Sequence, residues 1–496
     1  MPEGVSLSAL AALPWDAVLI LLPLTGAVAA GLWPRSARPI GLLVSAGGIP
    51  ILVGLGTAVA GTDGLHHAVG GWGAPLGIEL RADALSLVFL ATTALVGLGV
   101  ALYADSYFEP TLARWFWPLW LFLLGALNAL FLSADLFNLY VTLELMGLAA
   151  VALTALGGGR AALTGAMRYL LATLLGSLVY LLGVALLYHA TGTLDFGLLG
   201  QRLEAGPASR TALGLMGAGL ALKTALFPFH FWLPPAHASA PAPVSALLSA
   251  LVVKASFYIL VRLWLELFAP LAATAATGQV LGLLGMAAIL WGSWQALRQP
   301  RVKLLVAYST VAQIGYLFLA FPLLSAAGLP DAAAWRAVLW LVLAHALAKA
   351  AMFLAAGNLL RFGGHDRITD LDCVAQRLPL TVAAFALAGV SIAGLPPTGG
   401  FIGKWLLLEA ALLQGRWDLV TVMLLGGLLA AGYVFKVVGH FFTPAATRHE
   451  AQRVPARMEW TALGLAVLAL LLGLAPGILL PWFDSAVVMP MAGARQ

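Results

Sequence analysis

Residues 222–254 read LKTALFPFHFWLPPAHASAPAPVSALLSALVVK, and this stretch decides the fold. It joins two apolar segments, one with Lys223 and one with Lys254, through a proline-rich break at 227–235. Proline removes a backbone donor and clashes with the preceding helical turn, so we expect the first helix to break there. Irregular backbone at membrane depth is tolerated only where it is buried in protein or faces water. The stretch therefore predicts an interrupted transmembrane helix inside a larger bundle.

The composition of the whole chain indicates a membrane protein. Of its 496 residues, 61% are hydrophobic and 9% are charged, whereas a soluble domain has about 25% charged residues. Most of the surface must therefore face lipid. The net charge of +5 does not indicate nucleic-acid binding, because the basic residues lie between apolar segments instead of forming a patch.

Segments of about 17–25 apolar residues are long enough to cross a bilayer. The sequence predicts an all-α, polytopic fold with about fourteen such segments, near 15–33, 37–60, 84–104, 116–132, 135–157, 166–190, 211–230, 240–264, 272–296, 302–325, 336–360, 379–413, 418–442 and 459–482. The Gly-rich stretch at 61–83 is predicted to be an extracytoplasmic loop, with a hairpin as one option.

A second break, GLPPTGG at 394–400, interrupts the twelfth predicted span. It lies five spans after the first break, an odd number, so the two broken helices should run in opposite directions. Such a pair indicates inverted repeats, and chance recurrence of Leu-Pro-Pro is the alternative. We predict one transmembrane domain, 1–496, made of three N-terminal helices at about 1–110, a first five-helix repeat at 111–265, an inverted second repeat at 270–442 and a C-terminal helix at 443–496.

The distribution of basic residues predicts the orientation. Loops after odd-numbered spans hold fourteen arginines and lysines, Arg448 among them, and loops after even-numbered spans hold five. The positive-inside rule then places the odd loops in the cytoplasm and both termini outside. We expect a multi-pass protein of the bacterial cytoplasmic (inner) membrane.

The six lysines are placed differently from the twenty arginines. Nearly all arginines lie in loops or at span ends, whereas five lysines lie inside apolar spans: Lys223, Lys254, Lys349, Lys404 and Lys436. Burial can lower the pKa of a lysine by several units, but arginine stays protonated. A buried group that gains and loses a proton can therefore be lysine but hardly arginine.

Two polar residues, Lys436 and Glu409, have more than one interpretation, and a third, Lys303, has one. Lys436 lies near the end of its span, so it belongs either to a proton path or to the cytoplasmic headgroup region, which its side chain could reach. Lys303, beside two arginines, is predicted to be a plain cytoplasmic anchor. Glu409 is either an exit group or a surface charge.

Other titratable side chains extend the predicted path. Glu144 is the only carboxylate that we place near the middle of a span, and pairing with Lys223 would keep both groups charged. A static bridge between two helices is the alternative. His345 lies four residues before Lys349 on the same helix face, and histidine titrates near neutral pH. His230, at the first break, is either a relay or a hydrogen-bonding partner of freed backbone.

The sequence offers little for redox chemistry. The single cysteine, Cys373, excludes an internal disulfide and a four-thiolate iron–sulfur cluster supplied by this chain alone. The histidines show no regular pairing that would indicate haem. We expect no cofactor, no metal ion and no catalytic chemistry in the chain itself.

Several motifs resemble those of the proton-conducting antiporter-like membrane subunits. This family includes the large membrane subunits of respiratory complex I, of membrane-bound hydrogenases and of Mrp-type cation/proton antiporters. The similar segments extend over essentially the whole chain and are 135–144, 190–195, 222–234, 240–254, 303–309, 345–349 and 394–404. The first two most resemble the D-type subunits of the Mrp Na⁺/H⁺ antiporters.

The resemblance implies a role for each candidate residue. It makes Glu144 and Lys223 a modulating ion pair and Lys254 the central proton carrier. It makes His345 and Lys349 connecting groups, and Lys404 the terminal carrier.

Two positions differ from parts of the family. Gln313 stands where many complex I relatives carry histidine, which weakens a relay step at that position. Lys404 stands where some complex I subunits carry glutamate, which favours an Mrp-type or other lysine-bearing branch.

The resemblance therefore predicts the proton-translocating subunit of a multisubunit Mrp-type Na⁺(cation)/H⁺ antiporter. The alternative is a proton-pumping subunit of a complex I-type NADH dehydrogenase or a membrane-bound hydrogenase. A stand-alone organic-solute transporter is a third hypothesis, and it would need a substrate pocket at the helix breaks. The expected partners are protons, Na⁺ as a candidate coupling ion, other membrane subunits and the lipid bilayer, but no nucleic acid.

Overall fold

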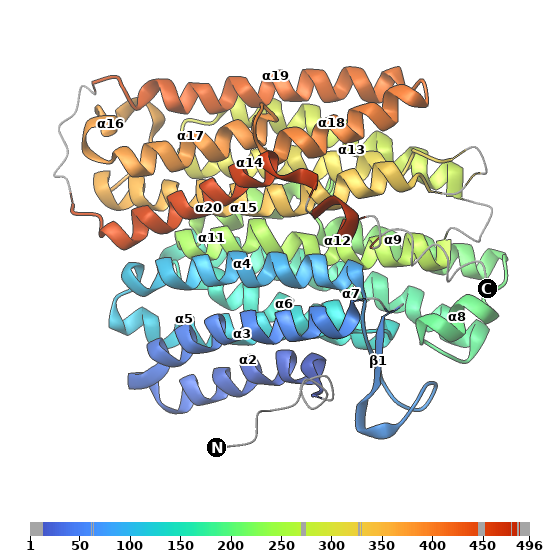
Figure 1. Cartoon of the computed structure of the whole chain (residues 1–496). Coiled ribbons are helices and arrows are strands. Elements are labelled where there is room, and N and C mark those ends of the chain that lie inside the picture. Colours follow the sequence, from blue (N-terminus) through green and yellow to red (C-terminus); the bar gives the residue numbers. More distant parts are fainter. Residues whose placement is uncertain are drawn as a thin grey trace.

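The computed structural model describes residues 13–60, 62, 64–268, 274–325, 328, 330–444, 452–477, 479–483 and 486. In these residues the long helices lie roughly parallel, from α2 at one edge of the molecule to α19 at the other (Figure 1). Both termini, which are predicted to lie outside, fall outside the described residues. Arg448 also falls outside them.

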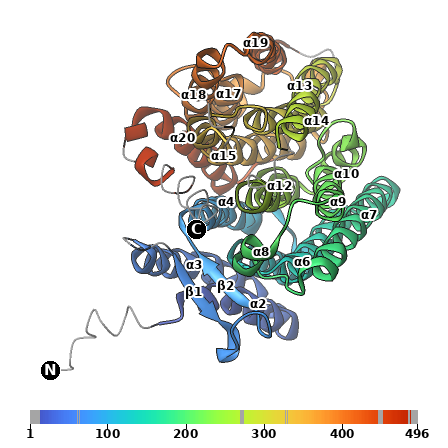
Figure 2. The same ribbon diagram turned by 90° about the vertical axis from the view of Figure 1, so that its right-hand side faces the viewer.

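The N-terminal helices are α2 (Trp15–Leu32), η1 (Pro34–Ser36), α3 (Ala37–Val59) and α4 (Ala84–Tyr107). Between α3 and α4 an antiparallel hairpin, β1 (Leu65–Ala68), η2 (Val69–Gly71) and β2 (Glu79–Ala82), extends from one end of the bundle (Figures 1 and 2). The hairpin predicted as one option at 61–83 is therefore present. Asp83 follows it directly and caps α4 by accepting from Ser86 N at 2.9 Å.

The next group of helices begins with α5 and ends with η5. Asp135 caps α6 by accepting from Asn138 N at 2.8 Å. The bounds are α5 (Pro110–Leu132), α6 (Leu136–Ala155), α7 (Gly159–Thr191), α8 (Phe196–Arg202), α9 (Pro207–Lys223), η3 (Phe229–Trp232), α10 (Leu233–Ser239), α11 (Ala242–Leu247), η4 (Leu248–Val252), α12 (Val253–Arg262) and η5 (Leu263–Phe268).

The second half follows the same pattern of long helices with one broken span. Its bounds are α13 (Thr274–Arg298), α14 (Val302–Leu317), η6 (Phe318–Ala320), α15 (Ala332–Gly363), η7 (Ile368–Asp370), α16 (Val374–Arg377), α17 (Pro379–Ala393), α18 (Gly399–Leu413), α19 (Trp417–His440) and α20 (Ala456–Leu474).

Both predicted breaks are present. Among the described residues, twelve helices are long and apolar enough to cross a membrane. The seventh and twelfth predicted spans are absent from these twelve because each is split into shorter helices. The first split separates α9 from η3 and α10, and the second separates α17 from α18. Twelve continuous spans and two broken ones together account for the fourteen predicted.

Two elements form the centre of the bundle. The continuous helical segment Ala242–Leu267 is almost entirely buried within the protein and so is the central part of helix α15, whereas most residues of α2 and α3 are at least partly exposed. Figure 2 shows α12 and α15 in the middle of the end-on view. Side chains on these two central helices are therefore shielded from lipid by other helices.

The C-terminal helix folds back over the centre. Helix α20 packs against α4, α15 and α17. At one end Asp105 of α4, whose side chain is fully buried, pairs with both Arg38 and Arg457. This carboxylate links α3, α4 and the first turn of α20, so the N- and C-terminal helices form one assembly.

Candidate functional site

Lys254 lies on α12 directly after the π-helical turn η4. Only 2% of the residue is exposed, and its ammonium group donates to the Ser249 carbonyl of that turn. The Ser249 hydroxyl in turn pairs with Thr310 of α14 at 2.9 Å. The wide turn thus supplies a backbone oxygen to an amine that has no access to lipid.

Lys349 lies near the middle of α15. It is fully buried and donates to the Val306 carbonyl at 3.0 Å and to the Ser309 hydroxyl, both on α14. The first half of α14 therefore provides the polar surroundings of this lysine.

Lys404 lies beside the second break. Its ammonium group donates to the carbonyls of Ile392 at 2.7 Å and Ala393 at 3.4 Å, which are the last residues of α17. Carbonyls at a helix C-terminus have no intrahelical partner and carry partial negative charge. The ammonium also lies 4.2 Å from the centre of the Tyr316 ring. The break thus creates the binding position for this amine.

His345 lies close to all three of these lysines. It is 5% exposed, and neither ring nitrogen has a hydrogen-bond partner among the described residues. Lys254, Lys349 and Lys404 all lie close enough to interact with it electrostatically. Lys254 and Lys404 also interact in this way with Lys349. We call these four residues the central amine cluster.

The central amine cluster has an unusual balance of charge. In the described part of the chain, its three ammonium groups donate to neutral oxygens and to no carboxylate. Buried charges are normally paired, and polar ring atoms in a protein interior are normally hydrogen-bonded. A group of this kind is suited to gaining and losing protons, because no counter-ion holds it in one state.

The predicted pair of Glu144 and Lys223 is also present. Lys223 Nζ lies 3.0 Å from Glu144 Oε1, and the Lys223 side chain is 3% exposed. Ser177 of α7 donates to the same carboxylate oxygen. The pair therefore connects α6, α7 and the last residue of α9, directly before the first break.

His230 lies apart from the central amine cluster. Its ring is partly exposed and stacks on Phe227, with 5.5 Å between ring centres. Lys436 also lies apart, since it donates to the carbonyls of Leu297 at 2.8 Å and Gln299 at 2.9 Å at the end of α13. Glu409 is exposed on α18.

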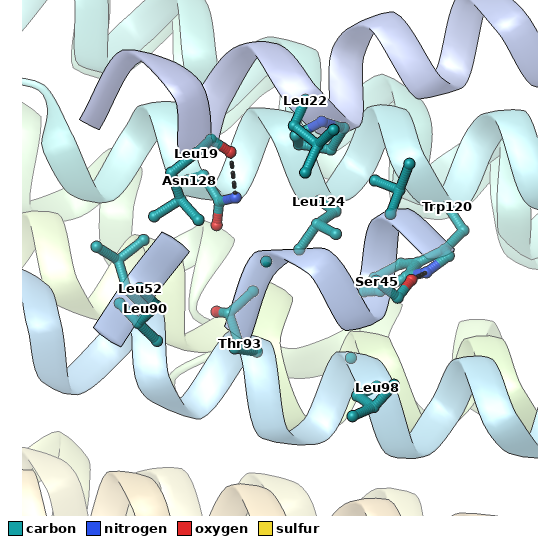
Figure 3. Close-up of a pocket in the computed structure, with 15 residues that line it drawn as sticks. Leu19, Leu22, Ser45, Leu52, Leu90, Thr93, Leu98, Trp120, Leu124 and Asn128 are labelled. Atoms are coloured by element: carbon teal, nitrogen blue, oxygen red, sulfur yellow. Dashed lines mark hydrogen bonds between the residues drawn. The ribbon is translucent and has the colours of Figure 1, made fainter. Parts of the chain in front are cut away.

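A pocket between α2, α3, α4 and α5 lies far along the chain from both breaks. Its lining is mostly apolar, with Ser45, Thr93 and Asn128 as polar members (Figure 3). The Asn128 amide donates to the Leu19 carbonyl at 2.8 Å, and Trp120 donates to Ser45 at 3.1 Å. This pocket gives no support to a solute site at the helix breaks.

The comparison with known families agrees with this geometry. Residues 133–430 match the family described as "NADH:quinone oxidoreductase/Mrp antiporter, TM". The chain belongs to this family. The matched segment includes all four residues of the central amine cluster, the Glu144–Lys223 pair and both helix breaks.

Relatives of this chain include subunits of both kinds of complex named in the family description. The N subunit of the NADH-quinone oxidoreductase of Desulforudis audaxviator is 36% identical over 482 residues, which cover 92% of this chain and 95% of the relative. The D-type subunit of the Na⁺/H⁺ antiporter of Bacillus subtilis is 29% identical over 483 residues, which cover 95% and 94%. A chain in the structure of the Mrp complex from Dietzia sp. has a TM-score of 0.87 at 25% identity, covering 97% and 98%.

His237 was not among the functional residues predicted from the sequence. This residue follows the first break on α10, is fully buried and stacks on Phe353 with 5.2 Å between ring centres. Lys254, Lys303 and Lys349 interact with it electrostatically. The available signal was its position within the decisive stretch, among alanines and prolines without charged neighbours.

The prediction that Lys303 is a cytoplasmic anchor is wrong. Lys303 is 1% exposed, and its ammonium group donates to the Ala240 carbonyl. Its backbone N donates to Asp366 at 3.0 Å, and the same carboxylate pairs with Arg301 at 2.7 Å. Arg301 lies in extended backbone directly before α14 and its side chain is partly exposed, whereas Lys303, in the first turn of α14, points inward.

Proposed function

We propose that this chain is the proton-translocating subunit of a multisubunit, Mrp-type Na⁺(cation)/H⁺ antiporter. The observation that carries the proposal is the central amine cluster, in which three buried lysines and one histidine interact without a carboxylate partner among the described residues. Burying such groups is unfavourable, and ionisable residues within a membrane are functional by default.

The cluster suggests how protons move. Lys254 accepts a proton, and a second positive charge in the same group repels the first. The proton is then passed through His345 and Lys349 to Lys404, next to the second break. His345 suits the middle of this route, because one imidazole nitrogen can accept a proton while the other donates one.

The Glu144–Lys223 pair acts as a modulator in this account. While the 3.0 Å pair is closed, Glu144 compensates the charge of Lys223. When it opens, an uncompensated positive charge appears at the first break and disfavours a proton on Lys254. A static bridge predicts instead that Glu144→Gln affects assembly and leaves the proton flux of assembled complexes unchanged.

The experiment uses the complete complex, reconstituted in liposomes with a pH-sensitive dye inside. An imposed Na⁺ gradient should drive proton movement in the wild type and not with Lys254→Ala. Lys436→Ala is the matched control, because it also removes a lysine from an apolar helix, yet Lys436 contacts the end of α13 and not the cluster. Undiminished flux in assembled Lys254→Ala complexes would refute the proposal.

A second candidate function has support from one relative. The relative that is 36% identical to this chain belongs to an NADH-quinone oxidoreductase, so the same proton path could be driven by electron transfer in other subunits. Gentle detergent extraction separates the two candidates. Co-purified subunits with flavin and iron–sulfur spectra would favour the redox complex, and Na⁺-driven proton flux without an electron donor would favour the antiporter.

The location belongs to the same proposal. We place the chain in the bacterial cytoplasmic membrane, with the hairpin β1–β2 outside and the loops rich in arginine inside. The distribution of basic residues supports this orientation.

A further inference from the structure

Three polar residues follow Lys254 at intervals of four along the same helix. Tyr258, Arg262 and Glu266 therefore lie on one face of the buried segment formed by α12 and η5. This polar row leads from Lys254 to the end of the bundle where the hairpin lies. It is a polar route along which a proton on Lys254 could leave the membrane.

Arg262 interrupts this row. It is only 3% exposed, and every nitrogen of its guanidinium group is occupied. Its Nε donates to the Tyr258 hydroxyl at 2.9 Å. Its Nη1 and Nη2 each donate to Asp83 at 2.6 Å, and Nη1 also donates to Glu266 at 3.0 Å.

The directions of these hydrogen bonds oppose proton transfer along the row. The Tyr258 hydroxyl donates to the Phe131 carbonyl at 2.7 Å, and its oxygen accepts from Arg262. A proton that reached Tyr258 would next have to enter Arg262, which has donors but no acceptor and does not give up its proton. The fixed positive charge also repels an approaching proton, as arginines do in pores that exclude protons.

The hairpin holds Arg262 in this position. Asp83 ends the hairpin and caps α4, while Arg81 of β2 pairs with both Asp83 and Glu266. Burial alone would raise the pKa of the Asp83 carboxyl, but Arg262 and Arg81 outweigh burial and lower it well below its ordinary value. Asp83 therefore stays ionised and keeps its two bonds to the guanidinium group.

We propose that Arg262, supported by Tyr258, Asp83 and Glu266, is a barrier that prevents protons on Lys254 from leaving along their own helix. Protons must then move sideways to Lys349 and Lys404, which keeps proton movement coupled to the rest of the complex. This inference rests on the proposed function, because it requires Lys254 to carry protons. A purely structural role, in which Arg262 only fastens the hairpin to α12, is the competing explanation.

The test is a passive leak measurement on the complete complex in liposomes. The buffer contains no Na⁺ and no electron donor, and a potassium diffusion potential drives protons inward. With Arg262→Gln we expect the leak to rise at least about tenfold above that of the wild type, since a neutral side chain with an acceptor replaces the barrier. In the double variant with Lys254→Ala the leak should return to the wild-type level.

Arg81→Gln is the matched control, because it removes another arginine from the same charged group but leaves the positive charge of Arg262 and its bonds to Tyr258, Asp83 and Glu266 in place. We expect the passive proton leak of the Arg81→Gln complex to stay at the wild-type level. A wild-type proton leak in the Arg262→Gln complex would refute the proposed barrier. An Arg81→Gln leak equal to that of Arg262→Gln would also refute it, as would an Arg262→Gln leak that persists in the double variant with Lys254→Ala.

If Arg262→Gln complexes do not assemble, Arg262→Lys distinguishes a proton barrier from a purely structural role of Arg262. Lysine keeps the positive charge but can release its proton, so the barrier predicts a measurable leak and a purely structural role predicts none. The proposed function is tested separately, through Na⁺-driven flux with Lys254→Ala. If the Arg262 variants do not leak while the Lys254→Ala complex has lost Na⁺-driven flux, the barrier is refuted and the proposed function stands.

Discussion

The three lysines of the central amine cluster differ from the arginines of this chain in what they contact. Arginines such as Arg262 and Arg301 pair with carboxylates, whereas Lys254, Lys349 and Lys404 donate to carbonyl and hydroxyl oxygens. Arginine remains charged in any surroundings, but a lysine held by neutral oxygens can exist with or without its proton. The choice of residue type therefore matches the two tasks of fixing a charge and moving one.

Replacing Lys349 by arginine tests this distinction. Arginine keeps the positive charge near Val306 and Ser309 but does not release a proton, so we expect the Na⁺-driven proton flux of assembled complexes to fall at least about tenfold. The flux is measured with the pH dye in liposomes, and assembly is checked by native gel. Wild-type flux with Lys349→Arg would mean that Lys349 serves only as a charge.

The two histidines near the first break should behave differently. His237 is buried and interacts with Lys254, Lys303 and Lys349, whereas His230 is partly exposed and stacks on Phe227. We expect His237→Gln to lower the proton flux and His230→Gln to leave it nearly unchanged. The same liposome measurement compares the pair. The reverse order would place the relay at His230, the residue that the sequence analysis selected.

Sequence alone predicted part of the site at this scale. The Glu144–Lys223 pair was predictable, because two isolated charges in apolar spans need a partner. His237 and Lys303 were missed because their burial depends on contacts distant in sequence. Lys303 donates to a carbonyl at residue 240, and its inward position follows from Arg301 taking the bond to Asp366.

At the scale of elements, both breaks position a lysine. Lys223 is the last residue of α9, and Lys404 binds the free carbonyls at the end of α17. Proline and glycine made both breaks predictable from sequence. The π-helical turn before Lys254 was not predictable, because a change from the α to the π hydrogen-bond pattern depends on how neighbouring helices pack.

Gly394 is the sharpest test of the second break. Its φ of +81° is a left-handed conformation, and a Cβ there would lie 2.6 Å from Lys404 Cδ. We expect Gly394→Ala to destabilise the complex by about 1–2 kcal/mol from the backbone conformation alone and to lower proton flux by displacing Lys404. Thermal unfolding and liposome flux measure the two effects.

Gly464→Ala is the control for that change. Gly464 lies within α20, and a Cβ there meets nothing within 4 Å. Alanine in a helix is more favourable than glycine by up to about 1 kcal/mol, so stability should be kept or raised. Equal behaviour of the two variants would contradict the importance of the break.

The division into inverted repeats remains a prediction. The broken spans α9–α10 and α17–α18 occupy corresponding places in the two halves. The predicted boundary between the repeats, near residue 270, falls on residues outside the described ones. We propose the repeats as the reason why the two breaks hold lysines in opposite halves of the molecule.

For the molecule as a whole, composition and apolar segments sufficed to predict an all-α membrane bundle. They could not rank the helices by burial, because α2 and α15 are similarly apolar while only α15 has a fully buried central part. Depth is decided by packing among helices. Three of the four residues of the candidate path, Lys254, His345 and Lys349, lie on the two most buried spans, which keeps their charges away from lipid.

The single cysteine allows a direct test of orientation. Cys373 is partly exposed in the connection between α15 and α17, which is predicted to be cytoplasmic. An impermeant maleimide should label it only after spheroplasts are lysed. In a Cys373→Ser background, Trp72→Cys on the hairpin, 66% exposed, should be labelled in intact spheroplasts. The opposite pattern would invert the proposed orientation.

The central claim is that Lys254, His345, Lys349 and Lys404 form one connected proton path. An experimental structure of the complete complex, at a resolution that shows ordered water, tests it most directly. We predict water within hydrogen-bonding distance of both His345 ring nitrogens, linking Lys254 on one side to Lys349 and Lys404 on the other. A dry apolar layer between Lys254 and Lys404, with no water at His345, would contradict the account.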